Sequence, residues 1–318
     1  MRKRLICNPI SFASVENWIL LRIQKENVIL GLEIILYAKC DKICRYLHTR
    51  IKMKHEKVGL FIDQLQSRGK YSFSIQEVLN KTKQPARTVR RTLERLQKKG
   101  RIVLVSRGYF AIIPLEYKES GVLPAEWFIH QLMDYLRLPY YVGLLSAAAL
   151  HGAGHQRPQE FQVIIGKQLR PIQAKGLRIR FFVKKNLDLS LGIDRVKTET
   201  GYIMVSSPEL TSLDVLKYFN AAGGLDNIAT VVSELGEKIN SNKLLKVASK
   251  EKSLVYIQRL GYLLDHLGFE SKAKALAQWL SGKKARPVLL DPAQKKEKSL
   301  FNKKWKLFEN QTIEAELL

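Results

Sequence analysis

Arginine side chains spaced for binding an anion are the most specific chemical feature of this sequence. Arg87, Arg91 and Arg95 recur every four residues between Pro85 and Gly100. On a helix this spacing places the three side chains along one side. A guanidinium group donates paired hydrogen bonds to phosphate oxygens or to the edge of a guanine. The spacing therefore predicts contact with an anionic partner.

The residues around these arginines predict an amphipathic helix over Pro85–Lys99. Pro85 suits the first helical position, and Gly100 suits the position just after the last turn. Such a helix can pack one side on a core and present the other to an anion. A solvated charged face is the alternative, so the neighbouring segments must decide. The predicted apolar stripe, at three- and four-residue spacing, consists of Ala86, Val89, Leu93 and Leu96.

Two helices and a hairpin are predicted around it. One helix begins at Val58 and ends near Gly69, and a second covers Ile75–Asn80. The second opens with Ser74 and Glu77 at the spacing of a capping box. After Gly100 come two β-rich runs joined by a small basic turn. The segments of this hairpin are Arg101–Val105, Ser106-Arg107-Gly108 and Tyr109–Ile113.

Three helices followed by a two-stranded hairpin are typical of a winged helix-turn-helix. The arginine-rich helix then takes the place of the recognition helix that enters the major groove, and Arg107 lies on the wing. A winged domain that binds only protein is the alternative. The residues predicted to contact DNA are Gln84, Arg87, Thr88, Arg90, Arg91, Arg95, Lys98 and Arg107.

Other chemistry is weakly supported by the sequence. His151 and His155 have the spacing of a metal pair, but two glycines lie between them and no third ligand is evident. The nuclease-like pairs Glu116-Tyr-Lys118 and Glu270-Ser-Lys272 fall in a linker and a helix, as chance matches would. No phosphate-binding loop and no serine in a nucleophile elbow is present. We therefore predict no catalytic residues, no metal site, no cofactor and no enzymatic activity.

Charge and cysteine content indicate the kind of partner and the cellular compartment. The 318 residues carry 54 Lys and Arg against 29 Asp and Glu, a formal net charge of +25 that favours polyanionic partners. The excess is densest in residues 53–114, with 14 basic and 4 acidic side chains. The three cysteines, Cys7, Cys40 and Cys44, all lie near one end of the chain. An odd number with none in the later domains argues against a disulfide framework and favours a reducing compartment. No apolar run reaches membrane-spanning length, so we expect a cytoplasmic protein without a membrane partner.

The sequence as a whole predicts four regions of different character. Residues 1–52 are either a helical extension or sequence ahead of a true start at Met53, and the second interpretation is favoured because nothing in the winged unit requires them. The winged unit occupies residues 53–114, a C-terminal domain residues 115–310, and a tail residues 311–318. In the C-terminal domain we expect helices at Pro124–Leu136 and Tyr140–Gly152, strands at Glu160–Ile165, Leu177–Val183, Ile193–Val196 and Tyr202–Val205, helices at Pro208–Phe219, Leu225–Leu235, Lys243–Ala248, Ser253–Leu267 and Ser271–Ser281, and a last strand near Trp305–Phe308.

Several short motifs in the second half, in their order, carry a family resemblance. They are Tyr140-Tyr-Val-Gly-Leu-Leu-Ser-Ala-Ala-x-x-His-Gly152, Gln156-x-Pro158, Ser207-Pro-Glu-Leu-Thr-x-Leu-Asp214, Gly223-Gly-Leu-Asp226, and Leu290-Asp-Pro292 followed by Trp305 and Asn310. From about Met53 to Asn310 the chain resembles the AbiEi-type antitoxins, the transcription regulators of abortive-infection (type IV) toxin–antitoxin systems. The motif residues also have a purely structural interpretation, with Ser207 as a helix cap and Trp305 closing the core.

The resemblance implies a fold and a function. The expected fold class is α+β, with an N-terminal winged helix-turn-helix followed by a two-lobed C-terminal domain, a small mixed β-sheet lobe plus a helical lobe. The expected function is phage defence: repression of the protein's own operon at inverted repeats in double-stranded DNA, and opposition to a nucleotidyltransferase-like toxin encoded nearby. Whether the toxin is contacted directly stays open. A ligand-sensing winged-helix regulator and a DNA-processing nuclease are the alternatives.

Overall fold

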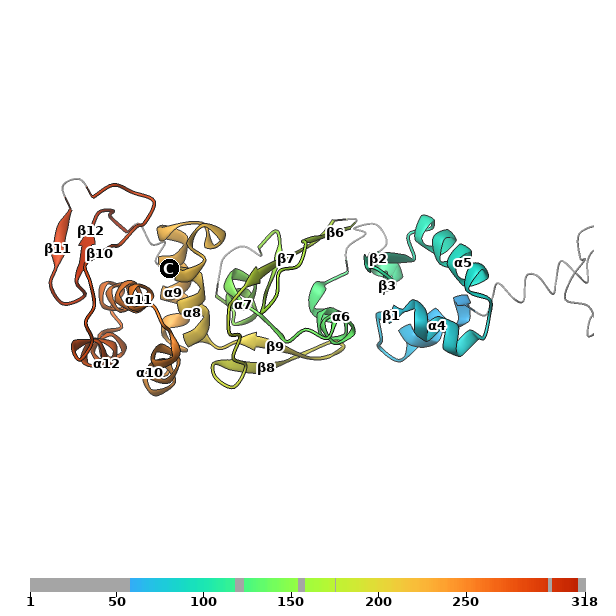
Figure 1. Ribbon diagram of the computed structural model, residues 1–318, viewed down its shortest axis with the longest axis horizontal. Helices are drawn as coiled ribbons and strands as arrows, with labels where there is room; N and C mark the ends of the chain where they lie inside the picture. The colour runs from blue at the N-terminus through green and yellow to red at the C-terminus, as the bar shows by residue number, and fades with distance from the viewer. Residues whose placement is uncertain (1–57, 118–122, 154–157, 175, 297–298, 314–318) are drawn as a thin grey trace, which may run out of the picture. The chain divides into compact units, whose positions relative to one another are not determined.

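A computed structural model describes residues 58–117, 123–153, 158–174, 176–296 and 299–313 (Figure 1). The predicted extension at residues 1–52, with all three cysteines, lies outside these ranges, as do Lys118 and His155. Within the described ranges, no helix has the length and apolar character needed to cross a membrane.

The predicted α+β class is confirmed, since helices and three separate sheets make up the described chain. The N-terminal part begins with a helix over residues 58–67. Its sheet has the order β1-β3-β2 with antiparallel pairing throughout. The other elements of this part are β1 (Ser72–Ser74), α4 (Ile75–Thr82), α5 (Ala86–Lys98), β2 (Ile102–Ser106) and β3 (Tyr109–Ile112).

Local sequence signals explain where these elements begin and end. The predicted capping box is present: Ser74 Oγ accepts from the Glu77 backbone N–H at 3.2 Å, and Glu77 Oε2 accepts from the Ser74 N–H at 2.6 Å. Gly100 follows α5 with φ 70°, a left-handed conformation that favours glycine. Pro85 is the N-cap of α5 and not its first helical residue, because its ψ of 138° is extended. Strand β1 was missed because three residues give too short a pattern.

A six-stranded mixed sheet, here called the central sheet, follows. Its order is β6-β7-β5-β4-β9-β8, with β4·β9 and β5·β7 parallel and the other pairs antiparallel. Strand β6 was not predicted from the sequence. The strands are β4 (Tyr140–Val142), β5 (Phe161–Ile165), β6 (Ile172–Ala174), β7 (Leu177–Val183), β8 (Ile193–Thr198) and β9 (Gly201–Ser206).

Two predicted helices around this sheet are corrected by the structure. Pro124–Leu136 is a 3₁₀ turn, Ala125–Trp127, followed by α6 (Ile129–Leu136). Tyr140–Gly152 is strand β4 followed by α7 (Leu144–Leu150). The aromatic and β-branched residues of β4 favour a strand, and pairing with β5 and β9 buries all three of them.

The two faces of the central sheet pack on different elements. Val142, Val163 and Val205 lie in the core shared with α6. Tyr141 and Ile164, which alternate with them, lie in the core shared with the helices that follow β9. Strands β4 and β5 are therefore buried on both faces.

The C-terminal part is helical, as predicted, and ends in a small sheet. Its helices are α8 (Pro208–Lys217), α9 (Leu225–Gly236), α10 (Ser241–Lys250), α11 (Leu254–His266) and α12 (Glu270–Ser281). The terminal sheet has the order β10-β12-β11, formed by β10 (Val288–Leu289), β11 (Leu300–Asn302) and β12 (Leu307–Glu309). Trp305 is fully buried against α11, where a side chain at Gly261 would overlap its ring.

Candidate nucleic-acid interface

The basic side chains predicted to contact DNA lie largely in solvent on α5. Val89 and Leu93 on the opposite side are 0% and 1% exposed, so the inner face of the helix is fixed in the core. Ala86, predicted to belong to this apolar stripe, is exposed in the first turn, and Thr92 takes a buried place instead. The exposed members of the predicted set are Arg87, Arg90, Arg91, Arg95, Lys98 and Arg107, whereas Gln84 and Thr88 are half-buried.

The charge on α5 is strongly one-sided. Its thirteen residues include five basic side chains and one acidic one, Glu94. Arg95 and Lys98 lie in the last turn, where the helix dipole favours positive charge. Just after the helix, the Arg101 guanidinium forms an ion pair with Asp63, which ties this end to the helix over residues 58–67. The arginines thus stand on a helix that is held along its length.

The turn that carries Arg107 is held by its backbone. The Tyr135 hydroxyl of α6 donates to the Arg107 carbonyl oxygen at 3.0 Å, and the Ile75 N–H donates to the Gly108 carbonyl oxygen at 2.8 Å. Gly108 has φ 74°, and a Cβ there would lie 3.2 Å from the Tyr135 hydroxyl. The Arg107 side chain is exposed, so it can meet a ligand while the turn stays in place.

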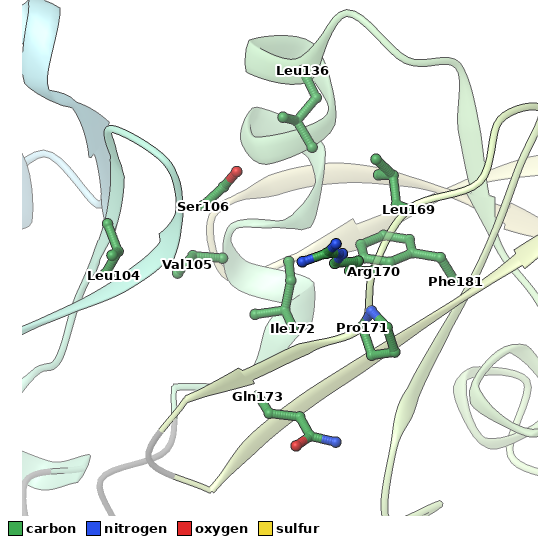
Figure 2. Close-up of a pocket in the computed structure, with 10 residues that line it drawn as sticks. All are labelled: Leu104, Val105, Ser106, Leu136, Leu169, Arg170, Pro171, Ile172, Gln173 and Phe181. Atoms are coloured by element: carbon green, nitrogen blue, oxygen red, sulfur yellow. The ribbon is translucent and has the colours of Figure 1, made fainter.

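The hairpin also borders a cavity. Val103, Val105 and Tyr109 pack into the core that contains α6, and beside this contact lies a cavity of about 440 Å³ (Figure 2). The lining comes from β2, from α6 and from the chain around β6, together with Phe181 of β7. Arg170 supplies the charged side chain among these lining residues.

The motif residues of the second half meet at a buried ion pair. Asp214 of α8 accepts a hydrogen bond from the Tyr141 hydroxyl at 2.7 Å and pairs with the Lys184 ammonium at 3.1 Å. Lys184 Nζ also lies 3.0 Å from the Tyr141 hydroxyl oxygen. Burial raises the pKa of the Asp214 carboxyl, and the Lys184 ammonium opposes that shift. Burial, followed by the nearby Asp214 charge, raises the pKa of Tyr141 far above its ordinary range.

A second group of motif contacts fixes the start of α7. Leu144 has φ 55°, an unfavourable value for leucine that its surroundings must hold. Next to it, Gln162 Oε1 accepts from the Leu145 N–H at 2.9 Å, and the Gln162 amide donates to the Ala221 carbonyl oxygen at 3.2 Å. Ser146 Oγ accepts from the Gln162 N–H at 2.9 Å. A strand residue therefore joins α7 to the chain that follows α8.

Residues of two further motifs, Ser207–Asp214 and Leu290–Asn310, also make contacts inside the fold, whereas Gln156 lies outside the described residues. Ser207 caps α8, as predicted, by accepting from the Leu210 N–H at 3.4 Å. Glu209 is buried and accepts from the Asn240 N–H at 2.8 Å. Near the end of the chain, the Asn310 amide donates to the Asp291 carbonyl oxygen at 2.9 Å. Trp305 closes the core, as its structural interpretation predicted.

Only some residues of the histidine pair and of the nuclease-like pairs lie in the part of the chain that the structure describes. His151 Nε2 donates to the Ser206 carbonyl oxygen at 2.6 Å, so this nitrogen is engaged with the backbone. The Lys272 ammonium contacts the Gly236 carbonyl oxygen and lies 5.0 Å from the centre of the Phe269 ring. Among the residues that the structure describes, no group of three or more His, Cys, Asp or Glu side chains is placed to hold a metal ion.

Three residues important in these contacts were missed by sequence reasoning. Lys184 is one of 54 basic residues, and its partner lies 30 positions away. Gln162 and Tyr135 likewise act on distant backbone groups. No local pattern marks such residues, because their role arises only from the packing of strands and helices.

Part of the region that carries these motifs matches a known family model. Residues 141–266 match the family model described as the AbiEi antitoxin C-terminal domain. The predicted resemblance to AbiEi-type antitoxins is thereby confirmed. The matched range contains Tyr141, Lys184 and Asp214 and ends at the last residue of α11. No curated protein matches the sequence.

Two solved structures are similar in part. The crystal structure of the RV2827C protein from Mycobacterium tuberculosis has a TM-score of 0.61 at 15% identity, covering 80% of this chain and 91% of that one. This likeness shows a shared fold. An antigenic nucleotidyltransferase-like protein from Paracoccidioides brasiliensis has a TM-score of 0.34 at 14% identity, covering 46% of this chain and 89% of that one. A TM-score this low does not show a shared fold.

The buried ion pair yields a stability prediction. Replacing Lys184 by Met removes the cation and leaves the Asp214 carboxylate buried without its partner. We expect a loss of about 3–5 kcal/mol in the free energy of unfolding. The double variant Lys184→Met, Asp214→Asn removes both charges and should recover part of that loss.

The neighbouring lysine provides the control for this experiment. Lys185 is exposed, and Lys185→Met should change the free energy of unfolding by no more than about 0.5 kcal/mol. Urea unfolding followed by circular dichroism measures all three variants. Equal stabilities for Lys184→Met and Lys185→Met would show that the buried pair does not hold the fold.

Proposed function

We propose that this protein is a DNA-binding antitoxin that represses its own operon and opposes a nucleotidyltransferase-like toxin encoded nearby. The observation that carries the DNA-binding half is the exposed arginine face of α5, set on a helix whose inner face is buried. The match of residues 141–266 to the AbiEi antitoxin C-terminal domain supports the antitoxin half. The protein acts by binding, without a reaction of its own, in the cytoplasm and in phage defence.

The DNA-binding unit in this proposal is a winged helix-turn-helix at residues 53–114, with α5 as recognition helix. The helix at residues 58–67, then α4 and α5, and the β1-β3-β2 sheet have the order that this fold requires. An α-helix fits the major groove, which is about 12 Å wide. The C-terminal antitoxin domain is placed at residues 115–310 and the tail at residues 311–318. The DNA contacts are Gln84, Arg87, Thr88, Arg90, Arg91, Arg95, Lys98 and Arg107.

The side chains divide between two kinds of contact. Arg87 lies in the first turn of α5, the end from which recognition helices usually read base edges. Arg91 and Arg95 lie further along and reach bases or phosphates. Arg107, on a turn with a fixed backbone, reaches a phosphate or the minor groove. The operator is an inverted repeat, bound as double-stranded DNA.

Single arginine substitutions test this interface. Replacing a base-reading arginine by alanine should cost about 1–3 kcal/mol of promoter affinity and relax specificity at one position. Replacing an arginine that contacts a phosphate should weaken binding to all DNA sequences alike. It should also reduce the slope of log affinity against log salt concentration by about one unit. Promoter binding is measured against salt concentration for Arg87→Ala, Arg91→Ala and Arg107→Ala.

An arginine outside the interface is the matched control. Arg178 of β7 is exposed, and Arg178→Ala should leave promoter affinity within about 0.5 kcal/mol of wild type. If Arg87→Ala, Arg91→Ala and Arg107→Ala all behave like this control, α5 and its hairpin do not read DNA.

The antitoxin half is tested by growth. Co-expression of the full-length protein with the product of the neighbouring toxin gene should restore growth. A variant with Arg87→Ala and Arg91→Ala should restore it equally when both genes are driven from foreign promoters, because repression then plays no part. Failure of the wild-type protein to rescue growth would refute the antitoxin claim, whatever the DNA-binding result.

A ligand-sensing regulator is the second candidate, and the cavity between β2 and β6 favours it. A volume of about 440 Å³ is within the range of small-molecule sites, and Arg170 suits a ligand with an apolar body and an anionic group. On this reading, a panel of nucleotides and aromatic carboxylic acids should contain a compound that raises the melting temperature and alters promoter binding. The effect should disappear in Arg170→Ala. A panel without any such compound favours the antitoxin instead.

A further inference from the structure

The terminal sheet exposes aromatic side chains on the face that points away from the core. Leu307 of β12 is fully buried, and the adjacent Phe308 points to the opposite face. Phe301 of β11 lies directly across from Phe308, with 5.0 Å between ring centroids and 48° between ring planes. Phe301 is 44% exposed, so part of its ring surface is accessible to a partner.

A lysine ammonium lies against this pair of rings, on a lysine-rich stretch of the chain. The Lys296 ammonium lies 3.7 Å from the centre of the Phe308 ring, close enough for a cation–π interaction. Residues 283–306 contain nine Lys and Arg against two Asp and Glu. Lys295, Lys296 and Lys303 are exposed. The rings therefore contact one cation directly and belong to a stretch of sequence with an excess of positive charge.

We propose that this face of the terminal sheet, formed by Phe301, Phe308 and Lys296, binds single-stranded nucleic acid. Exposed aromatic rings on a sheet accept unpaired bases by stacking, and nearby ammonium groups neutralise the phosphates. A duplex cannot bind in this way, because its bases are already stacked on one another. A protein partner is a poorer fit, since lysine is depleted at protein–protein interfaces.

This site lies on different residues and different elements from the arginine face of α5, and it would bind a different kind of ligand. The α5 side chains form a row of guanidinium groups suited to a duplex groove, whereas Phe301 offers the ring surface that an unstacked base requires. The chemistry is common to RNA and to single-stranded DNA. The experiment therefore uses both.

Binding of short labelled oligonucleotides to the full-length protein tests the proposal. Fluorescence anisotropy is measured with a 15-residue oligouridine, a 15-residue oligothymidine and a duplex of the same length without operator sequence. We expect Phe301→Ala to weaken binding of at least one single strand about tenfold. Phe301→Trp should restore it, since indole also stacks. Lys296→Gln should reduce the slope of log affinity against log salt concentration by about 0.7 unit, because one phosphate contact is lost.

Two variants provide the controls. Tyr202 is 50% exposed with the Arg195 guanidinium 4.8 Å from its ring centre, so Tyr202→Ala removes a comparable aromatic–cation pair from β9. It should leave single-strand binding unchanged. The double variant Arg87→Ala, Arg91→Ala is the background in which Phe301→Ala is measured again, so that binding by α5 does not mask the loss. Circular dichroism melting verifies that each variant is folded.

Several results would overturn the proposal. They are wild-type affinity in Phe301→Ala, an equal loss in Tyr202→Ala, and preference for the duplex over both single strands in the Arg87→Ala, Arg91→Ala background. Absence of single-strand binding together with a Phe301-dependent complex with the neighbouring toxin would assign the face to a protein partner. None of these results bears on promoter binding by α5.

Discussion

The structure depends on a central sheet that has to be covered on both faces. Strands β4 and β5 carry mostly apolar or aromatic side chains that are buried on both faces, so neither face of the middle of the sheet can be left in water. The side with Val142 and Val163 is covered by α6 and continues into the core below the β2–β3 hairpin. The side with Tyr141 and Ile164 is covered by the C-terminal helices. Burial of one sheet thus joins the hairpin to the helical part.

The motifs that carry the family resemblance serve this arrangement. Asp214, Tyr141 and Lys184 form a buried polar contact between α8 and the sheet, and its cost is offset only while all three groups remain paired. Gln162 performs a similar task between β5, α7 and the residues after α8. These side chains are occupied with one another, so the surfaces available to partners lie elsewhere, on α5 and on the terminal sheet.

Both of these surfaces combine charge with a rigid support, but they differ in kind. On α5, guanidinium groups stand on a helix whose inner side is buried. On the terminal sheet, an ammonium group and an exposed ring stand on strands whose other face carries the fully buried Leu307. Secondary structure held by a core presents such groups with little loss of conformational entropy on binding.

The sequence by itself determined most elements whose signals are local. The capping box at Ser74, the glycine after α5 and the strand-like runs of β5 and β7 each depend on residues within a few positions, and the structure has them. Only the tertiary structure decided that Tyr140–Val142 is a strand, because its pairing partners are β5 and β9. The same holds for Lys184 beside Asp214 and for the turn of Arg107 held by Tyr135, since packing alone brings these distant residues together.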